Sequence, residues 1–414
     1  MFDSLVKRKG VQNGLWLYLL QFFNTIVPLL TLPYITRILG ADGYGFFTIA
    51  LNIIGYLQVI VEYGFAMSAT REVAVGKNVN LDRLFSEVVF SRVILMGLSL
   101  LIAGIYMAIV RNVQSNLCLC LLLFCLPGYC LQMNWLYQGK EEMKYISIVN
   151  IISRSLSVIG TFIFVKSEAD LFLYCILYAA SPLLSGIIGF TLAKYKYKLQ
   201  FVRLDFKGII NSLKKGWYVF TTQLGAKVFG AIGVTILGFL VLPREVGIYS
   251  AIQKIPNILL LAWLPISQVI YPISSRKMQN GYTEGSVFVK KMQKLFLPLF
   301  GAVSVVVAIF ARTIVKTAFG SEYLEYYYLL FPLLAWMLVS INNNFLGVQT
   351  LLASGHDNDY SKCFYIGVVI TVISNLLLIL AFGVVGAALA PLISEIALGI
   401  VLWKSKNKIE AVSL

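Results

Sequence analysis

The chain has 414 residues, of which 59% are hydrophobic and only 13% are charged, and its mean hydropathy is +0.81. A soluble domain of this length needs a charged surface that this composition does not supply, so we exclude a soluble globular protein. The net charge of +15 would suggest a nucleic-acid partner for a soluble protein, but Lys and Arg also collect on the cytoplasmic loops of membrane proteins. We therefore expect no nucleic-acid partner.

In chain order, the apolar residues form twelve blocks, each long enough to cross a bilayer, which takes about 20 mostly apolar residues. The blocks cover residues 11–36, 43–65, 84–109, 116–138, 145–165, 169–193, 216–241, 246–274, 287–311, 324–349, 361–382 and 384–403. The first block follows Lys7, Arg8 and Lys9, and no small-residue cleavage site comes after it. We interpret it as a transmembrane helix, and we expect an all-α membrane protein with about twelve such helices.

The basic residues divide unequally between the two sets of predicted loops. Loops on the side of the termini, among them the second with Arg71, Lys77 and Arg83, carry 24 Lys and Arg residues, whereas the opposite loops carry six. Because cytoplasmic loops are enriched in Lys and Arg, we predict a multi-pass membrane protein with both termini cytoplasmic. Part of the basic excess suits anionic headgroups, so membrane lipids are expected partners.

The longest predicted inner loop, residues 194–215, is basic and interleaved with aromatic residues. Part of this linker is expected to lie on the membrane surface. It separates an N-terminal six-helix lobe (1–193) from a C-terminal six-helix lobe (216–403), and a cytoplasmic tail (404–414) follows.

The two halves resemble each other in sequence. Pro182–Ser185 in the sixth block is echoed by Pro391–Ser394 in the twelfth, and Gln21 in the first block matches Gln223 in the seventh. An even number of helices in each half gives the two copies the same orientation, so we expect a parallel repeat with a substrate site between the halves. Chance similarity among apolar segments remains the alternative.

The run Pro33–Gly45 reads PYITRILGADGYG and resembles the signature of polysaccharide-export flippases of the Wzx type. Segments after the second, fourth and tenth blocks are similar to that family too: Ala69–Glu72, Tyr137–Gly139 and Ala353–Gly355. The family belongs to the superfamily of MATE drug exporters and lipid II flippases. The resemblance covers essentially the whole chain. It implies a MATE-like fold of two lobes, alternating access and a place in a bacterial inner membrane. It also implies an O-antigen unit on undecaprenyl pyrophosphate as the substrate, with other polysaccharide-assembly membrane proteins as partners.

Six charged residues fall inside the predicted spans: Arg92, Arg154, Lys227, Lys254, Glu62 and Glu395. A charge at mid-bilayer costs about 2.5–3.5 kcal/mol on insertion scales, so such side chains are expected to face a wet cavity or a partner. Polar residues accompany some of them at helical spacing, which gives them a shared face. We predict that the substrate-binding cavity is lined by Arg154, Lys227, Lys254, Arg92, Asn150, Gln223, Asn257, Gln21 and Asn24.

Two alternatives stay open for these residues. Neutral polar side chains also form hydrogen bonds between helices in a dry bundle. Arg92 and Lys254 lie about two turns from a predicted boundary, so their long side chains could reach the membrane surface.

The predicted cavity residues suit a lipid-linked sugar. A pyrophosphate is an anion that does not cross hydrocarbon unaided; Arg and Lys offer it charge and donors, and Arg can bind two phosphate oxygens at once. Amides and hydroxyls can exchange hydrogen bonds with sugar hydroxyls. Together with the resemblance, this predicts a flippase that moves undecaprenyl-pyrophosphate-linked O-antigen units from the cytoplasmic to the periplasmic leaflet.

Three charged residues are candidates for coupling or gating: Glu395, Glu62 and Arg37. A carboxylate in low dielectric needs a partner, water or a proton, so Glu395 is expected to pair with a cavity cation or to bind a coupling ion, a proton or sodium. A static packing role is the alternative. No other cofactor and no metal are expected, because the six cysteines lack CxxC pairing and lie in or beside apolar blocks.

Two other functions compete with a flippase. A MATE-type small-molecule exporter shares the expected fold, but for cationic drugs it should favour acidic cavity residues. A membrane O-antigen polymerase or ligase handles the same lipid, but such enzymes usually have a large outer loop, and the outer loops here are short. No GxxxxGK[ST] loop for ATP occurs, so we expect a transporter and not an enzyme.

Overall fold

The computed structural model describes residues 2–76, 80–203 and 206–413, and almost all of them are helical. Ten of the described helical segments are long and apolar enough to cross a membrane. The expected all-α, multi-pass membrane architecture is therefore confirmed, whereas the count of twelve spans and the internal repeat stay predictions. Lys77 lies outside the described residues, as do the side chains of Lys7, Arg8 and Lys9.

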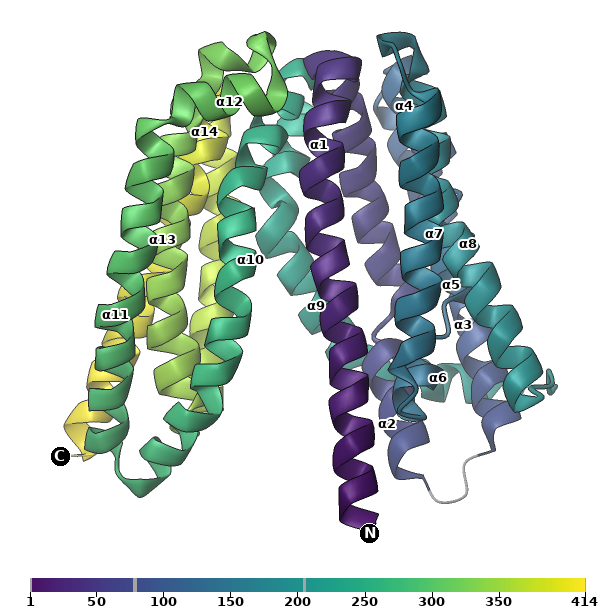
Figure 1. The fold of residues 1–414 in the computed structure, drawn as a ribbon, viewed down its shortest axis with the longest axis horizontal. Helices are drawn as coiled ribbons and strands as arrows, with labels where there is room; N and C mark the ends of the chain where they lie inside the picture. Colours follow the sequence, from purple (N-terminus) through teal and green to yellow (C-terminus); the bar gives the residue numbers. More distant parts are fainter. Residues whose placement is uncertain (1, 77–79, 204–205, 414) are drawn as a thin grey trace. The chain divides into compact units, whose positions relative to one another are not determined.

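The chain forms two compact units, which we describe separately. Unit 1, Met1–Lys227, is drawn from purple to teal in Figure 1. It contains α1 (Phe2–Glu62), α2 (Phe65–Val75), α3 (Leu81–Ile109), α4 (Val113–Leu122), α5 (Cys125–Leu131), α6 (Asn134–Gly139), α7 (Met143–Phe164), the short 3-10 helix η1 (Glu168–Asp170), α8 (Leu171–Tyr197) and the first part of α9 (Phe206–Leu240).

The long helix α1 consists of two helices joined at Gly40. The φ angle of Gly40 is +66°, in the left-handed region that glycine adopts without steric cost. In Figure 1 the purple ribbon rises from the N-terminus, turns, and returns beside itself. The turn falls between the first two predicted spans, 11–36 and 43–65.

The predicted span 116–138 corresponds to one candidate membrane span, but three short helices, α4, α5 and α6, make it up. Pro127 has no amide hydrogen to donate to the carbonyl of Leu123, which lies at the break between α4 and α5. A second break comes at Gln132, whose backbone is extended and which ends α5. At this second break the carbonyl of Gln132 therefore accepts from a side chain, Arg92, and not from a following helical turn.

Unit 2, Val228–Leu414, is drawn from teal to yellow in Figure 1. It contains the rest of α9, α10 (Pro243–Asn280), α11 (Tyr282–Ile309), α12 (Ala311–Phe319), the 3-10 helix η2 (Ser321–Leu329), α13 (Leu330–Leu346), the π-helical segment η3 (Gly347–Leu352) and α14 (Asp357–Ser413). Like α1, α14 is broken at a glycine with positive φ, Gly383 at +56°, which lies between predicted spans 361–382 and 384–403.

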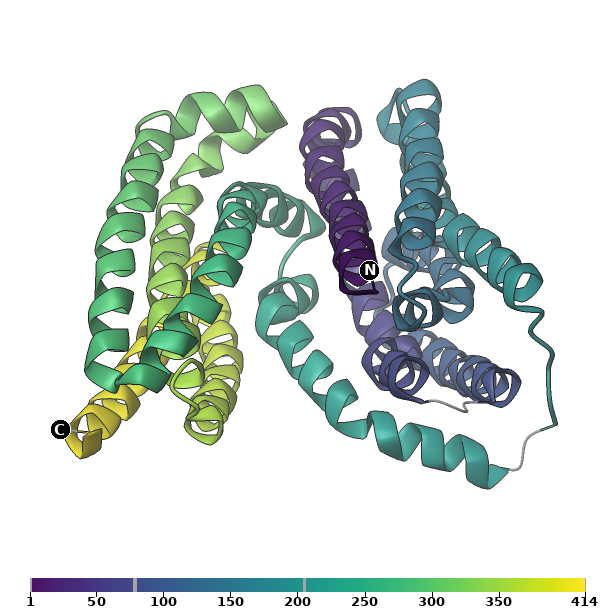
Figure 2. The same ribbon diagram turned by 60° about the horizontal axis from the view of Figure 1, so that its bottom comes forward.

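The boundary between the two units lies inside α9. The first part of α9 belongs to unit 1 because its side chains pack there. Phe220 stacks on Tyr63 with 4.5 Å between ring centroids, and Lys215 forms an ion pair with Glu72 at 3.2 Å. Figure 2 shows α9 as a bent helix. The predicted lobe limits themselves stay predictions.

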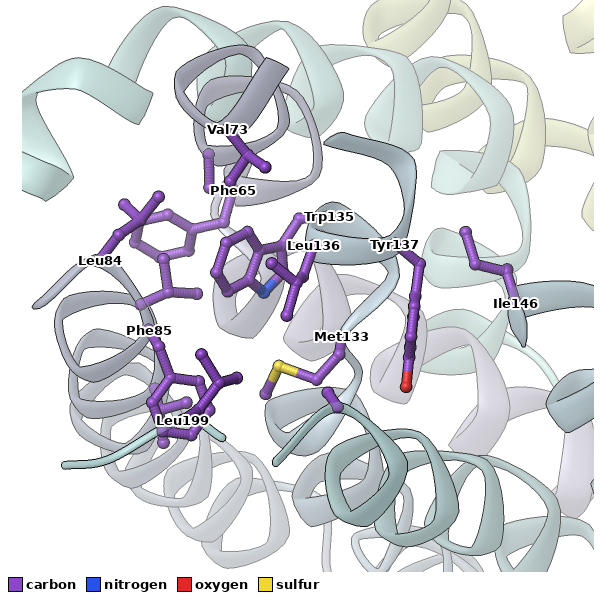
Figure 3. Packing of buried hydrophobic residues seen from close by; sticks show 14 of the residues in the cluster. Phe65, Val73, Leu84, Phe85, Met133, Trp135, Leu136, Tyr137, Ile146 and Leu199 are labelled. Atoms are coloured by element: carbon purple, nitrogen blue, oxygen red, sulfur yellow. The ribbon is translucent and has the colours of Figure 1, made fainter. Parts of the chain in front are cut away.

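The apolar cluster between α2, α3 and α6 is a closely packed part of unit 1 (Figure 3). Phe65 and Trp135 lie next to each other in this cluster, Phe85 points toward Leu199, and all three aromatic residues are at most 1% exposed. Tyr137 of α6 stacks on Tyr145 of α7, with 5.4 Å between ring centroids. The cluster therefore holds the start of α7, the helix whose later turns carry the predicted cavity residues.

Candidate functional site

Unit 1 encloses a cavity of about 190 Å³ between α1, α5, α7 and α8, which we call the unit 1 cavity. Its lining is mostly polar or aromatic and consists of Asn24, Val27, Thr31, Tyr129, Gln132, Asn150, Arg154, Ser157, Val158, Thr161, Tyr174, Tyr178, Ser181, Pro182 and Ser185. Such a lining on long apolar helices forms a polar site at the depth of the membrane spans.

Three of the predicted cavity residues meet in the unit 1 cavity: Asn24, Asn150 and Arg154. Asn150 and Arg154 are four residues apart on α7 and therefore lie on one face. The Arg154 guanidinium donates through Nη1 to Oδ1 of Asn24 on α1, at 2.8 Å. Asn24 is neutral, so this bond orients the guanidinium without neutralising its charge. A half-buried Arg154 can offer its other donors to an anion in the cavity.

The lining residues that were not predicted from the sequence include Tyr129, Gln132, Tyr174 and Tyr178. Tyr174 and Tyr178 lie four residues apart on α8, so helical spacing could have identified a shared face. Gln132 donates to Ser185 Oγ at 3.2 Å, and its position depends on the break that ends α5. Phenol and amide groups give the cavity hydrogen-bonding capacity beside its single cation.

Arg92 of α3 is buried, but it does not line the unit 1 cavity. Its Nη1 donates to the carbonyl of Gln132 at 2.6 Å and lies 3.5 Å from the carbonyls of Tyr129 and Cys130. These carbonyls lie at the end of α5, where no following helical turn satisfies them. Arg92 therefore holds the broken span in shape and positions Gln132, whose side chain does line the cavity.

Lys227 of α9 lies away from the unit 1 cavity, against the second half of α1. Its ammonium is 5.3 Å from the ring centroid of Tyr56. The adjacent Gly55 leaves room for it, since a Cβ at that position would overlap Lys227 Nζ. Further along α1, Glu62 accepts a hydrogen bond from Gln58 at 2.8 Å. The structure therefore does not bring Lys227 and Arg154 into one cavity.

Unit 2 encloses two adjoining cavities of about 240 and 160 Å³, which we call the unit 2 cavities. The larger one is lined by Phe229, Gly230, Gly233, Val234, Tyr249, Gln253, Asn257, Trp336, Thr371, Asn375, Pro391, Ser394 and Glu395. Glu395 lines the smaller one too, together with Ser340 and Asn343. The predicted residues Asn257 and Glu395 thus meet around the larger cavity.

Glu395 is the charged side chain of the unit 2 cavities; the other lining residues are neutral or apolar. It is only 4% exposed. Nδ2 of Asn343 donates to Glu395 Oε2 at 2.6 Å and to its backbone carbonyl at 2.7 Å. Asn375 in the larger cavity is 1% exposed, and its Oδ1 has no hydrogen-bond partner in the described part of the chain. Groups that can form hydrogen bonds therefore line the cavity together with the Glu395 carboxylate.

The remaining predicted residues lie outside the three cavities. Gln21 and Arg37 of α1 and Lys254 of α10 are exposed, and Gln223 of α9 is half-buried. Within the described ranges, no three His, Cys, Asp or Glu side chains gather as ligands for a metal ion. All six cysteines are free thiols.

The chain is similar to proteins that are named as transporters and flippases. The sequence profile of the family described as "Polysaccharide biosynthesis protein" matches residues 11–278. A "Putative O-antigen transporter" of Escherichia coli strain K12 is 27% identical over 387 residues, which cover 93% of each chain. A "Probable low-salt glycan biosynthesis flippase" of Haloferax volcanii is 22% identical, over 92% of this chain and 80% of that protein.

Two solved structures share the fold. The lipid II flippase MurJ in an inward closed conformation matches 95% of this chain and 87% of that chain, with a TM-score of 0.73 and 14% identity. An inward-facing multidrug resistance MATE family transporter matches 94% and 98%, with a TM-score of 0.68 and 13% identity. The expected MATE-like fold is therefore confirmed, and identities this low show the fold alone.

Proposed function

Because the chain belongs to the polysaccharide biosynthesis protein family, whose Wzx-type flippases its sequence motifs resemble, we propose that it flips a lipid-linked oligosaccharide. The cargo is an O-antigen unit on undecaprenyl pyrophosphate, moved from the cytoplasmic to the periplasmic leaflet of a bacterial inner membrane. Relatives named as an O-antigen transporter and a glycan biosynthesis flippase support this assignment over an enzyme such as a polymerase or ligase.

The observation that carries the proposal is the composition of the unit 1 cavity. Its single cation, Arg154, is oriented by neutral Asn24 and stands beside Asn150, Gln132 and Tyr178. A guanidinium can bind phosphate oxygens through two parallel hydrogen bonds. Amide and phenol groups exchange hydrogen bonds with sugar hydroxyls. The cavity therefore has donors for both ends of a sugar–phosphate linkage.

We further propose that transport occurs by alternating access, as the family resemblance implies. The polar headgroup enters a wet site on the cytoplasmic side and leaves it on the periplasmic side, while the lipid tail stays in the bilayer. Loosely spaced polar groups such as those of the unit 1 cavity suit a cargo that must be released again. Membrane lipids and other polysaccharide-assembly proteins are the proposed partners, the latter as suppliers and acceptors of the cargo.

Coupling is proposed at Glu395, through a proton or sodium. Its carboxylate is buried among neutral polar groups, a setting in which binding a cation relieves the cost of an isolated charge. Glu62, which faces Gln58, and Arg37, which lies near the turn of α1, are proposed for coupling or gating on the evidence of their positions alone.

An exporter of cationic small molecules is the second candidate, because Glu395 makes the unit 2 cavities acidic. The two functions separate in proteoliposomes. We expect the purified protein to move a defined lipid-linked oligosaccharide to the opposite leaflet and to leave a cationic dye untransported. Dye efflux without oligosaccharide flipping would favour the exporter over the flippase. The absence of both activities would contradict both candidate functions.

A further inference from the structure

Helix α13 carries three consecutive asparagines, Asn342, Asn343 and Asn344, and each bonds to a different helix of unit 2. Successive side chains of an α-helix point about 100° apart, so three neighbours necessarily face three directions. The partners lie on α11, α14 and α10 respectively. This run therefore ties α13 to three neighbouring helices at one level.

The outer two asparagines fix the rotation of α13. Gln293 of α11 donates to Asn342 Oδ1 at 2.6 Å, and Ser267 of α10 donates to Asn344 Oδ1 at 2.8 Å. Gln349, in the π-helical segment that follows α13, donates to both the carbonyl and the hydroxyl of Ser267 at 3.0 Å. These contacts hold α13 from both sides and direct Asn343 toward α14.

Asn343 contacts Glu395 in a way that depends on the charge of the carboxyl. Its Nδ2 donates to Oε2 of Glu395 and to the Glu395 carbonyl, and an amide nitrogen cannot accept a hydrogen bond. An ionised carboxyl accepts this bond more strongly than a neutral carboxyl, which can keep its proton on Oε1 but then carries little negative charge on Oε2. The contact therefore favours the ionised form, against burial, which favours the neutral form.

The close packing around Asn343 offers a second way to test its contact with Glu395. Gly399 lies one turn beyond Glu395 on α14, and a Cβ at position 399 would lie 2.6 Å from Asn343 Oδ1. The absence of a side chain at Gly399 thus gives Asn343 the space it needs to reach Glu395.

The other groups around Glu395 do not provide a compensating cation. Ser340 of α13 is its second hydrogen-bond partner. The titratable residues facing the same cavities are Tyr249 of α10 and Tyr360 of α14, and no Lys, Arg or His lines either cavity in the described part of the chain. Support for a negative charge on Glu395 therefore comes from neutral donors, foremost Asn343.

We propose that Asn343 is a positioning residue that stabilises the ionised form of Glu395 and so sets the pH range of coupled transport. The proposal rests on the coupling role proposed for Glu395. It is separable from flipping itself, because the protonation of Glu395 can be measured without a cargo.

The test compares Asn343→Ala with wild type in the purified, reconstituted protein. Infrared difference spectra over a pH series report the protonated carboxyl, and loss of that band in Glu395→Gln assigns it. Losing a hydrogen bond to a charged group should move the midpoint upward by about one to two pH units, because the carboxyl then keeps its proton to higher pH. The pH profile of oligosaccharide flipping should move in the same direction.

Two variants control for structural damage. Gly399→Ala crowds Asn343 while leaving both polar side chains in place, and we expect an upward shift as well. Asn342→Ala removes the equivalent amide contact to α11 and should leave the midpoint unmoved. An unmoved midpoint in Asn343→Ala and Gly399→Ala, or an equal shift in Asn342→Ala, would overturn the proposal. A shifted midpoint in Asn343→Ala, in a protein that does not flip the oligosaccharide, would support the role of Asn343 and contradict the proposed function.

Discussion

The guanidinium of Arg154 is held by an amide and not by a carboxylate: Nη1 donates to Asn24 Oδ1 at 2.8 Å. An ion pair would fix the side chain more firmly, but it would also cancel the charge that an anionic cargo needs. Because α1 and α7 are distant in sequence, this bond also helps to fix the position of α7 relative to α1. Asn24 therefore orients the Arg154 side chain and leaves the positive charge of Arg154 available to bind the cargo.

The first prediction follows from that pairing. Asn24→Asp has almost the same shape but places a negative charge beside Arg154, so we expect most flipping to be lost. Arg154→Ala should lose a comparable amount, tenfold or more, because one charge-assisted hydrogen bond contributes about 1.5–3 kcal/mol. Restoration of surface O-antigen in a strain lacking its flippase is the readout, after expression and membrane insertion have been checked.

Exposed Arg312 of α12 provides the matched control, since Arg312→Ala removes an arginine outside the cavities and should retain normal flipping. Near-normal O-antigen from well-inserted Asn24→Asp and Arg154→Ala proteins would contradict an anion-binding role for the unit 1 cavity.

Much of the fold follows from the sequence because long apolar blocks have few alternatives inside a bilayer. The turns at Gly40 and Gly383 fall between predicted spans. Asn24, Asn150 and Arg154 could be predicted together because a charge inside an apolar span and the helical spacing of polar residues can both be read from the sequence. In the structure these three residues line one cavity.

Other parts of the site depend on distortions that periodicity does not reveal. Arg92 was expected in the cavity, yet it binds carbonyls that are free only because α5 ends at Gln132. Tyr174 and Tyr178 were missed because tyrosine in an apolar helix suits a lipid interface as well as a cavity. Lys227 was grouped with Arg154 because both lie inside predicted spans beside polar residues at helical spacing, and neither feature fixes which neighbour a side chain meets.

The second prediction concerns Lys227, half-buried against Tyr56 of α1. If its charge attracts the pyrophosphate, the sign of the charge matters more than its shape. We expect Lys227→Arg to keep partial flipping, Lys227→Ala to lose most of it, and Lys227→Glu to abolish it through repulsion. Flipping rates in proteoliposomes are measured beside Lys316→Ala, which removes an exposed lysine of α12. Equal rates for the Ala and Glu variants would point to packing and not to charge.

The third prediction concerns Glu395. Glu395→Gln keeps an oxygen that can accept from Asn343 but can no longer bind a proton or hold a charge. We expect slow flipping that no longer varies with pH. Glu284→Gln, at an exposed position of α11, should behave as wild type. Wild-type rates with an unchanged pH profile in Glu395→Gln would exclude an essential ionisable role.

The fourth prediction is the topology, which rests on the distribution of Lys and Arg between loops. Single cysteines replace exposed Gln200, Asn280 or Glu322 in a variant without the six native cysteines. In intact spheroplasts an impermeant thiol reagent should label only position 322, and lysis should expose the other two. Labelling of positions 200 and 280 in sealed cells would reverse the orientation.

The last prediction concerns the packing behind the unit 1 cavity, where Gly128 of α5 meets Gly186 of α8. A Cβ on Gly128 would overlap the carbonyl of Pro182, and a Cβ on Gly186 would overlap the carbonyl of Gly128. Backbone atoms cannot rotate away as a side chain can, so the helices would have to separate. Small residues at such crossings let membrane helices pack closely.

We therefore expect Gly128→Ala and Gly186→Ala each to destabilise the protein by about 1–3 kcal/mol, the usual range for overpacking. The measurement is thermal unfolding in detergent, monitored as the fraction of protein that stays monodisperse.

Gly189→Ala is the matched control: it lies three residues further along α8, and a Cβ there meets nothing within 4 Å. Its stability should equal or slightly exceed wild type, since alanine is the better helix former. Equal stability of all three variants would mean that α5 and α8 do not pack through their glycines. Because Pro182 and Gln132 line the cavity from these two helices, the destabilised variants should also flip more slowly, whereas Gly189→Ala should not.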